Sequence, residues 1–117
     1  MSMDCIFCSI AAGEIPAKIV VQTPTVVAFK DINPQAPLHV QVIPVAHIVD
    51  AAHLEVGDAE VLTEMLAVAK QVASDAGYDA ETRGYRLVMN VGPDSQSTVP
   101  HLHLHVLAGR SMTWPPG

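Results

Sequence analysis

The chain has 117 residues, a length typical of one domain, and half of them are hydrophobic, which is enough to bury a core. Twelve acidic residues against six basic ones give a net charge of −6, which argues against binding a nucleic-acid polymer along its backbone. There is neither a run of eighteen apolar residues nor a basic and apolar leader, so we expect no membrane span and no signal peptide. With only two cysteines, we expect a cytoplasmic protein.

The N-terminal half predicts a short helix and then three strands. The helix is expected over 5–12, with Asp4 as its N-cap and Gly13 at its end. The turn Thr23-Pro24-Thr25 separates two strands of a hairpin, and Pro44 is expected to end the third strand. Segments rich in Val and Ile place these strands over 17–22, 26–30 and 38–43, with a loop at 31–37.

The C-terminal half predicts a long helix and two more strands. Apolar side chains recur at helical spacing over 58–76, and Gly77 suits the position after the helix. Strands are expected over 85–91 and 100–108, with a polar loop at 92–98 between them. Short connections favour a single α+β domain over 1–117, in which a short and a long helix pack on one face of a five-stranded antiparallel sheet.

Three histidines alternate with apolar residues in the last predicted strand. If 100–108 is a strand, Leu102, Leu104 and Val106 point into the core, and His101, His103 and His105 share the opposite face. Imidazole is suited to proton transfer, to nucleophilic attack and to metal binding. The alternative is a half-buried strand whose polar face happens to be histidine, although Thr, Lys, Glu or Ser are more usual there.

Clustered histidines suit nucleophilic attack on phosphorus. The attacking ring nitrogen must be neutral, so a partner such as a backbone carbonyl has to keep the proton on the other nitrogen. Flanking imidazoles can then hold phosphate oxygens and protonate the leaving group. The sequence contains neither a Gly-x-Ser-x-Gly nucleophile motif nor a phosphate loop of the Walker type.

The segment His101-Leu-His-Leu-His-Val-Leu107 resembles the signature of the histidine-triad (HIT) family of nucleotide hydrolases and transferases. The resemblance extends over nearly the whole chain, and the tail matches the Hint-like branch, which contains purine nucleoside phosphoramidases. Further matching segments are Gly13-Glu-Ile-Pro-Ala-Lys18, Ala28-Phe-Lys-Asp-Ile-Asn-Pro-Gln-Ala-Pro-Leu-His39, Val42-Ile-Pro44, Asn90-Val-Gly92 and Val106-Leu-Ala-Gly-Arg-Ser-Met-Thr-Trp-Pro-Pro-Gly117.

The resemblance implies a catalytic role for four histidines. It makes His103 the nucleophile that forms a nucleotidyl-histidine intermediate. His101 would orient His103, and His105 would contact the phosphate. His39 would be a fourth active-site histidine that supports His103, although a histidine at a strand end also fits a plain polar face.

The resemblance also implies a nucleotide site. Asp31 would bind the ribose hydroxyls with both carboxylate oxygens, and Asn90 would contact the phosphate or the sugar. An apolar clamp around the base would be formed by Phe7, Phe29 and Ile32. The alternatives are ordinary core packing for the three apolar residues and a strand-ending role for Asn90.

The loop before the triad departs from the family pattern Gly-Gln-Ser/Thr-Val-x-His. Gln96 and Ser97 occupy the usual Gly and Gln positions, and Thr98 falls where a hydroxyl contacts the leaving group. Loss of the glycine removes a permissive backbone position, so we expect a different loop path around the phosphate.

Cys5 and Cys8 have the spacing of half a zinc site, and histidines would have to complete it, with His47, His53 and His101 as candidates. Some bacterial HIT proteins that this chain resembles hold a structural zinc with ligands that match Cys5, Cys8, His47 and His101. Other Hint-branch members function without these cysteines, so zinc would not be needed for the chemistry. A reduced free pair and a redox pair are the alternatives.

We therefore expect a HIT-family hydrolase of purine nucleoside phosphoramidates or related nucleotidyl conjugates, such as those of AMP or GMP. Three alternatives stay open: a dinucleoside polyphosphate hydrolase, a nucleotide-binding regulatory module with weak catalysis, and a zinc-stabilised interaction domain. Family members that the chain resembles are homodimers, so a homodimer is expected, with neither a nucleic-acid polymer nor a membrane as partner.

Overall fold

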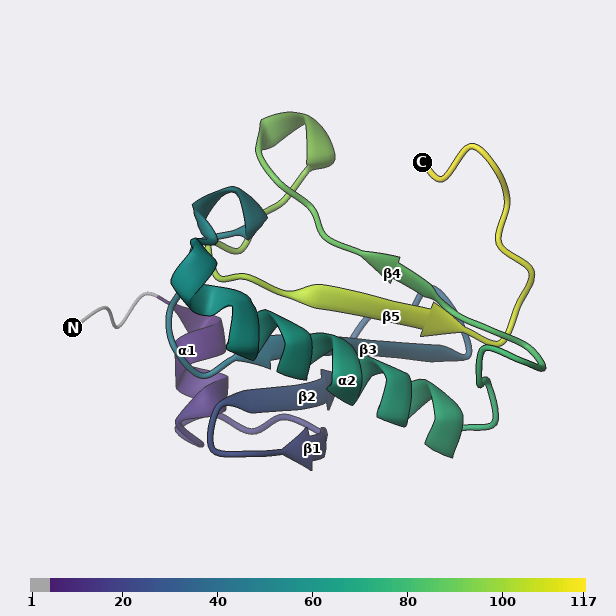
Figure 1. The fold of residues 1–117 in the computed structure, drawn as a ribbon, viewed down its shortest axis with the longest axis horizontal. Coiled ribbons are helices and arrows are strands. Elements are labelled where there is room, and N and C mark those ends of the chain that lie inside the picture. The colour runs from purple at the N-terminus through teal and green to yellow at the C-terminus, as the bar shows by residue number, and fades with distance from the viewer. Residues whose placement is uncertain (1–4) are drawn as a thin grey trace.

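The chain folds into one antiparallel sheet with a helix on each side (Figure 1). The computed structural model describes residues 5–117. The helices are α1 (Ile6–Ala11) and α2 (Ala59–Asp75), and the strands are β1 (Ile19–Gln22), β2 (Val26–Lys30), β3 (Leu38–Pro44), β4 (Arg86–Val88) and β5 (Leu104–Ala108). Three short 3-10 turns, η1 (Ala51–His53), η2 (Val56–Asp58) and η3 (Pro93–Ser95), were not predicted. The predicted α+β class, with a short and a long helix, is confirmed.

The five strands lie in the order β1-β2-β3-β5-β4, and each neighbouring pair is antiparallel. The central pair brings β3 against β5, with Val40 opposite Val106 and Gln41 opposite His105. Three predicted strands are shorter than expected, since β1 begins at Ile19 rather than at Ala17, β4 spans only three residues, and β5 begins at Leu104 rather than at Pro100. β3 includes Pro44 as its last residue, opposite Val26, whereas the expected strand stopped at Ile43.

The main core lies between the sheet and α2. The apolar stripe of α2 buries Met65, Val68, Ala69, Val72 and Ala73 against one face of the sheet. Leu102, Leu104 and Val106 are buried in the same cluster, as their alternation predicted. Glu64 of α2 also accepts a hydrogen bond from the hydroxyl of Thr23, at 2.8 Å, which ties the helix to the β1–β2 turn.

The expectation that both helices pack on one face is wrong. On the other face, Val27, Phe29 and Ile43 form a second cluster with Cys5 and Phe7, which belong to α1 and its N-cap. β2 therefore has four consecutive buried residues, Val26 to Phe29, because both of its faces are covered.

The N-terminus of α1 is capped by a cysteine. The Sγ of Cys5 accepts a hydrogen bond from the backbone N–H of Cys8 at 3.2 Å. The expected cap, Asp4, lies outside the described residues. Among residues 5–117, no helix is both long enough and apolar enough to span a bilayer.

Candidate active site and metal centre

Three histidines gather on the face of the sheet that also carries α1. His39 comes from β3 and His105 from β5, while His103 lies just before β5. The ring centroids of His103 and His105 are 5.0 Å apart, and those of His39 and His105 are 5.1 Å apart. His101 faces elsewhere, toward the two cysteines. The triad is therefore divided between two centres and does not form a row on one strand.

His103 has the tautomer that a nucleophile needs. Its Nδ1 lies 2.8 Å from the carbonyl oxygen of His101, and a carbonyl can only accept, so Nδ1 carries the hydrogen. Nε2 is then left with a free lone pair. The ring is 8 % exposed, and the ring of Phe7 packs edge-on against it at 5.3 Å. The backbone at 101, rather than its imidazole, thus orients His103.

A chain of hydrogen bonds fixes the protons of His39 and His105. The backbone N–H of Gln35 donates to Nδ1 of His39 at 3.0 Å, so the ring hydrogen of His39 lies on Nε2. That Nε2 lies 2.9 Å from Nδ1 of His105, which must accept. His105 therefore carries its hydrogen on Nε2 and can donate it to a bound group. The hydrogen bond of His39 goes to His105, so the expected support of His103 by His39 would have to act through His105.

Burial keeps these imidazoles neutral. Desolvation, together with smaller effects of the neighbouring His103 and His39, lowers the pKa of His105 to about 4. Desolvation also lowers the pKa of His39, although the carboxylate of Asp31 works in the opposite direction. A neutral His105 with a fixed Nε2–H is a hydrogen-bond donor at neutral pH.

Asp31 lies beside this chain and is held by two neighbours. Its Oδ1 accepts from the backbone N–H of Asn33 at 2.8 Å, and its Oδ2 accepts from Nε2 of Gln41 at 2.8 Å. Oδ2 also lies 3.4 Å from Nε2 of His39. Each carboxylate oxygen retains a lone pair for a further donor. Gln41 was not predicted, although it lies two residues after His39 and so on the same face of β3.

The residues expected to clamp a base are only partly brought together. Phe7 and Phe29 are buried, with ring centroids 5.4 Å apart, so they also belong to the core. Ile32 is fully exposed. Asn90 is half-buried, two residues beyond the end of β4.

The loop before the triad keeps a left-handed turn without its glycine. Gln96 has φ 61° and ψ 30°, a conformation that glycine adopts without strain. Its backbone N–H donates to the carbonyl of Pro93 at 2.9 Å, which closes η3. Thr98 is exposed two residues later. Gln96 therefore occupies a backbone conformation that suits glycine better.

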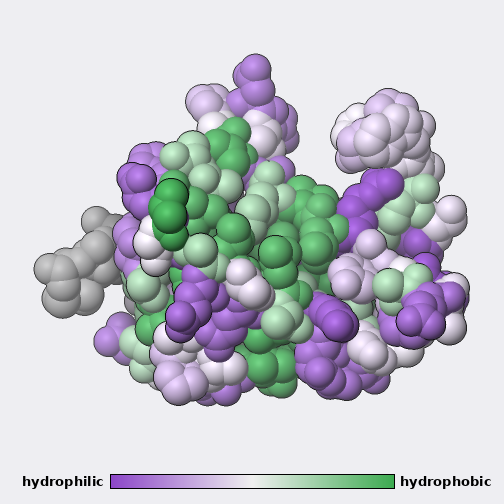
Figure 2. All heavy atoms as spheres, in the orientation of Figure 1, coloured by the Kyte–Doolittle hydropathy of each residue, from purple (hydrophilic) through white to green (hydrophobic). Residues whose placement is uncertain are grey.

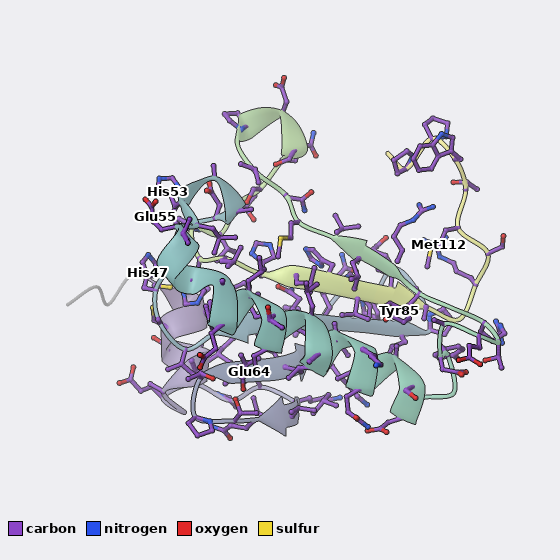
Figure 3. All side chains as sticks on the ribbon, in the orientation of Figure 1. His47, His53, Glu55, Glu64, Tyr85 and Met112 are labelled. Atoms are coloured by element: carbon purple, nitrogen blue, oxygen red, sulfur yellow. The ribbon has the colours of Figure 1, made fainter. Side chains whose placement is uncertain are left out.

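The second centre contains four metal-ligating side chains. Ligand atoms of Cys5, Cys8, His47 and His101 all lie within 4.8 Å of one another. Nδ1 of His101 lies 3.1 Å from Sγ of Cys5, 3.4 Å from Sγ of Cys8 and 3.2 Å from Nδ1 of His47. Tetrahedral zinc needs N–N and S–N separations of about 3.3 and 3.6 Å. The candidate His53 is not part of this cluster: its Nδ1 lies 2.7 Å from Oδ1 of Asp50, and Figure 3 shows it apart from His47, beside Glu55.

Tautomers distinguish this centre from a second cluster. Nε2 of His101 lies 2.9 Å from the carbonyl oxygen of Pro44, so it carries the hydrogen and leaves the Nδ1 lone pair for a metal. Asp31, His39 and His105 also lie within 4.8 Å of one another, but the Nε2 that His39 offers carries a hydrogen. The cysteine cluster thus fits a metal ion, whereas the second cluster fits a hydrogen-bonded chain.

Cys5 and Cys8 form no disulfide in this structure. Desolvation, aided by the neighbouring Cys5, raises the pKa of Cys8 to about 11. Without a metal ion the Cys8 thiol is therefore protonated at neutral pH, and metal binding has to release its proton.

Comparison with known proteins agrees with the fold and with the cluster. Residues 12–112 match the HIT domain model. A relative from Synechococcus elongatus, an uncharacterised HIT-like protein, is 44% identical over the full length of both chains. A protein from Zea mays named 14 kDa zinc-binding protein is 44% identical, with 96% of this chain and 87% of that protein covered.

Solved structures of HIT proteins have the same fold. A HIT family hydrolase from Legionella pneumophila has a TM-score of 0.93 and 46% identity, with 97% of this chain and all of that chain covered. A histidine triad protein from Clostridium difficile has a TM-score of 0.90 and 37% identity, with coverage of 97% and 96%. Sequence and structure together lead to one conclusion: the chain belongs to the HIT domain family.

Proposed function

We propose that this protein hydrolyses purine nucleoside phosphoramidates or related nucleotidyl conjugates through a nucleotidyl-histidine intermediate. The observation that carries the proposal is the tautomer of His103. Its Nδ1–H is held by the His101 carbonyl, so a neutral Nε2 is available for attack on phosphorus. The structure neighbour from Legionella pneumophila is described as a HIT family hydrolase, which supports the reaction class.

The reaction would proceed in two displacements. His103 Nε2 attacks the α-phosphorus, the phosphorus–nitrogen bond breaks, and the amine leaves with a proton from a neighbouring donor, which the attacking water of the second step restores. Water then attacks the phosphorus, the bond to Nε2 breaks, and the nucleoside monophosphate is released. The His101 carbonyl stabilises the charge that the attacking imidazole acquires. The Nε2–H of His105 stabilises charge on the phosphate oxygens, and Thr98 supplies a hydroxyl for the leaving group.

The nucleotide would bind along the same face of the sheet. The remaining lone pairs of Asp31 accept from the ribose hydroxyls, and Gln41 keeps the carboxylate in place. Phe7 and Phe29 would form the floor under the base, with the exposed Ile32 free to cover it. Asn90 would contact the phosphate or the sugar.

We further propose a structural zinc ion bound by Cys5, Cys8, His47 and His101. Its chemistry there would be to join α1 to the segment before β5, and no catalytic step requires it. Two ligand thiols that must stay reduced suit a reducing compartment such as the cytoplasm. The name of the Zea mays relative supports zinc as the metal.

A homodimer accounts for the surface beside α2. β4 is an edge strand of the sheet, and edge strands have unpaired backbone groups. Leu87 of β4 and Leu66 of α2 are exposed, and Figure 2 shows apolar atoms gathered on the face that carries α2. Sedimentation equilibrium tests this proposal, and a monomer at micromolar concentration would refute it.

The decisive experiment measures amine release from adenosine phosphoramidate in metal-free buffer. His103→Ala is expected to lower kcat at least a thousandfold, because it removes the nucleophile. The matched control is His53→Ala, which removes an exposed imidazole outside the site and should leave kcat unchanged. Wild type that binds AMP but releases no amine would refute the hydrolase and favour the nucleotide-binding module. Faster cleavage of a dinucleoside polyphosphate would instead favour that substrate class.

A further inference from the structure

All three arginines of the chain line one hollow at the end of the sheet opposite to the metal centre. Arg83, Arg86 and Arg110 surround a cavity of about 370 Å³, together with Tyr85, Ser111 and Met112. Figure 3 shows Tyr85 and Met112 close together there, far from His47. In a chain with a net charge of −6 and six basic residues, this placement concentrates half of the basic side chains in one place.

The guanidinium groups of this hollow are not neutralised by carboxylates. Among residues 5–117, the ion pairs within 4.0 Å are those of His39 and His53 with aspartates. Arg83 lies over the ring of Tyr78, 5.3 Å from its centroid. Arg110 donates from Nε to the carbonyl oxygen of Gln35 at 3.0 Å and from Nη1 to that of Ser111 at 3.3 Å.

The nearby carboxylate of Asp79 has another partner. Asp79, four residues before Arg83, accepts a hydrogen bond from the hydroxyl of Thr82 instead. Three arginines thus line an open space, and none of them has a carboxylate partner within 4.0 Å among residues 5–117. Guanidinium groups present paired N–H donors that match two oxygens of a phosphate, and charge-assisted bonds of this kind are about twice as strong as neutral ones.

We propose that this hollow is a binding site for a phosphate group, distinct from the phosphate position at His105. The cavity is larger than a phosphate ion and lies at the lower end of the volumes of small-molecule sites, so the phosphate can be free or carried by a small molecule. None of the residues that line it belongs to the proposed nucleotide site. The backbone of one residue connects the two sites, since the carbonyl of Gln35 accepts from Arg110 and its N–H donates to His39.

The test titrates inorganic phosphate into isotope-labelled protein and follows backbone amide shifts by NMR. Saturable shifts are expected at Gly84, Arg86 and Ser111. Arg86→Gln should weaken binding about tenfold. The matched control Lys70→Gln removes the same charge from an exposed position on α2 and should leave the affinity unchanged. If Arg86→Gln does not fold, as judged by its amide spectrum, the exposed Arg83→Gln replaces it, with the same expected loss.

A second titration with glycerol 3-phosphate distinguishes the two sources of the group. Equal or tighter binding than that of inorganic phosphate indicates a carried phosphate, and much weaker binding indicates a free ion. Three outcomes would overturn the proposal. They are shifts confined to amides of the 92–98 loop, equal affinities of the arginine and lysine variants, and no shift at about 10 mM phosphate. Because no turnover is measured, these outcomes do not depend on the proposed hydrolysis.

Discussion

The buried, neutral state of His105 predicts how the stability of the fold depends on pH. In the folded protein its pKa is lowered from 6.5 to about 4, chiefly by desolvation. Between these two values the unfolded chain binds a proton that the folded protein does not bind. The free energy of unfolding therefore falls as the pH is lowered from 6.5 to about 4 and changes no further below that value on account of this group.

The size of this effect follows from the pKa interval. If the whole difference between a pKa of 6.5 and one of about 4 contributes, the free energy of unfolding changes by about 3 kcal/mol. His105 is only partly buried, so solvent screening reduces the expected figure to about 2 kcal/mol. Burial lowers the pKa of His39 and of His101 as well, and both therefore act in the same direction.

Urea unfolding of the wild type and of His105→Asn, at a pH near 7.5 and a pH near 4, isolates the contribution of this one residue. The wild type should lose about 2 kcal/mol more than the variant on acidification, because the other histidines contribute to both proteins and cancel. Both proteins are measured with the same chelator, so that loss of metal also cancels. Equal losses in the two proteins would refute the inference that His105 is held neutral by its surroundings.

Three further predictions concern the hydrogen-bonded chain, the metal centre and the loop. His39→Leu should lower kcat about tenfold because His105 loses control of its tautomer, whereas His39→Gln keeps an N–H donor and should recover part of the rate; equal losses would contradict this role. Cys8→Ser should abolish zinc binding, measured by elemental analysis, and lower Tm by several degrees, while retained stoichiometric zinc would disprove the ligand set. Gln96→Gly should raise the free energy of unfolding by about 1 kcal/mol in urea, because glycine relieves the left-handed conformation; Ser97→Gly is the matched control, and an equal gain there would count against this reasoning.

Elements with a strong periodic pattern were predicted from sequence within one or two residues. The stripe from Val61 to Ala76 predicted α2, because a helix that covers a sheet must repeat its apolar face every 3.6 residues. The placement of α1 was not predicted, although a signal was present. Four consecutive apolar residues, Val26 to Phe29, indicate a strand covered on both faces, because a strand with one exposed face alternates apolar and polar residues.

The extent of β5 was predicted wrongly because alternation alone does not prove a ladder. The segment before Leu104 keeps buried leucines on one side, yet the N–H of Leu102 donates to the carbonyl of Ile48 in a loop. This departure lets the ring of His101 face the cysteines. Contacts with residues distant in sequence determine the path of this segment, and the alternating pattern alone does not predict them.

The candidate site was predictable where side chains carry the chemistry and not where the backbone does. The cluster of Cys5, Cys8, His47 and His101 was expected from the family resemblance, and the structure brings these four residues together. The carbonyl of Pro44 and the N–H of Gln35 fix two tautomers, but every residue has a carbonyl and almost every residue an N–H, so no motif marks them.

His101 serves the two centres through different parts of the same residue. Its ring faces the cysteines, whereas its main-chain carbonyl holds the Nδ1–H of His103. Any amino acid at this position would bring that carbonyl with it. Replacing the ring would therefore leave the backbone hydrogen bond to His103 in place. The two centres share a residue but do not both require its side chain, so the proposed metal binding can be lost while the proposed hydrolysis is retained.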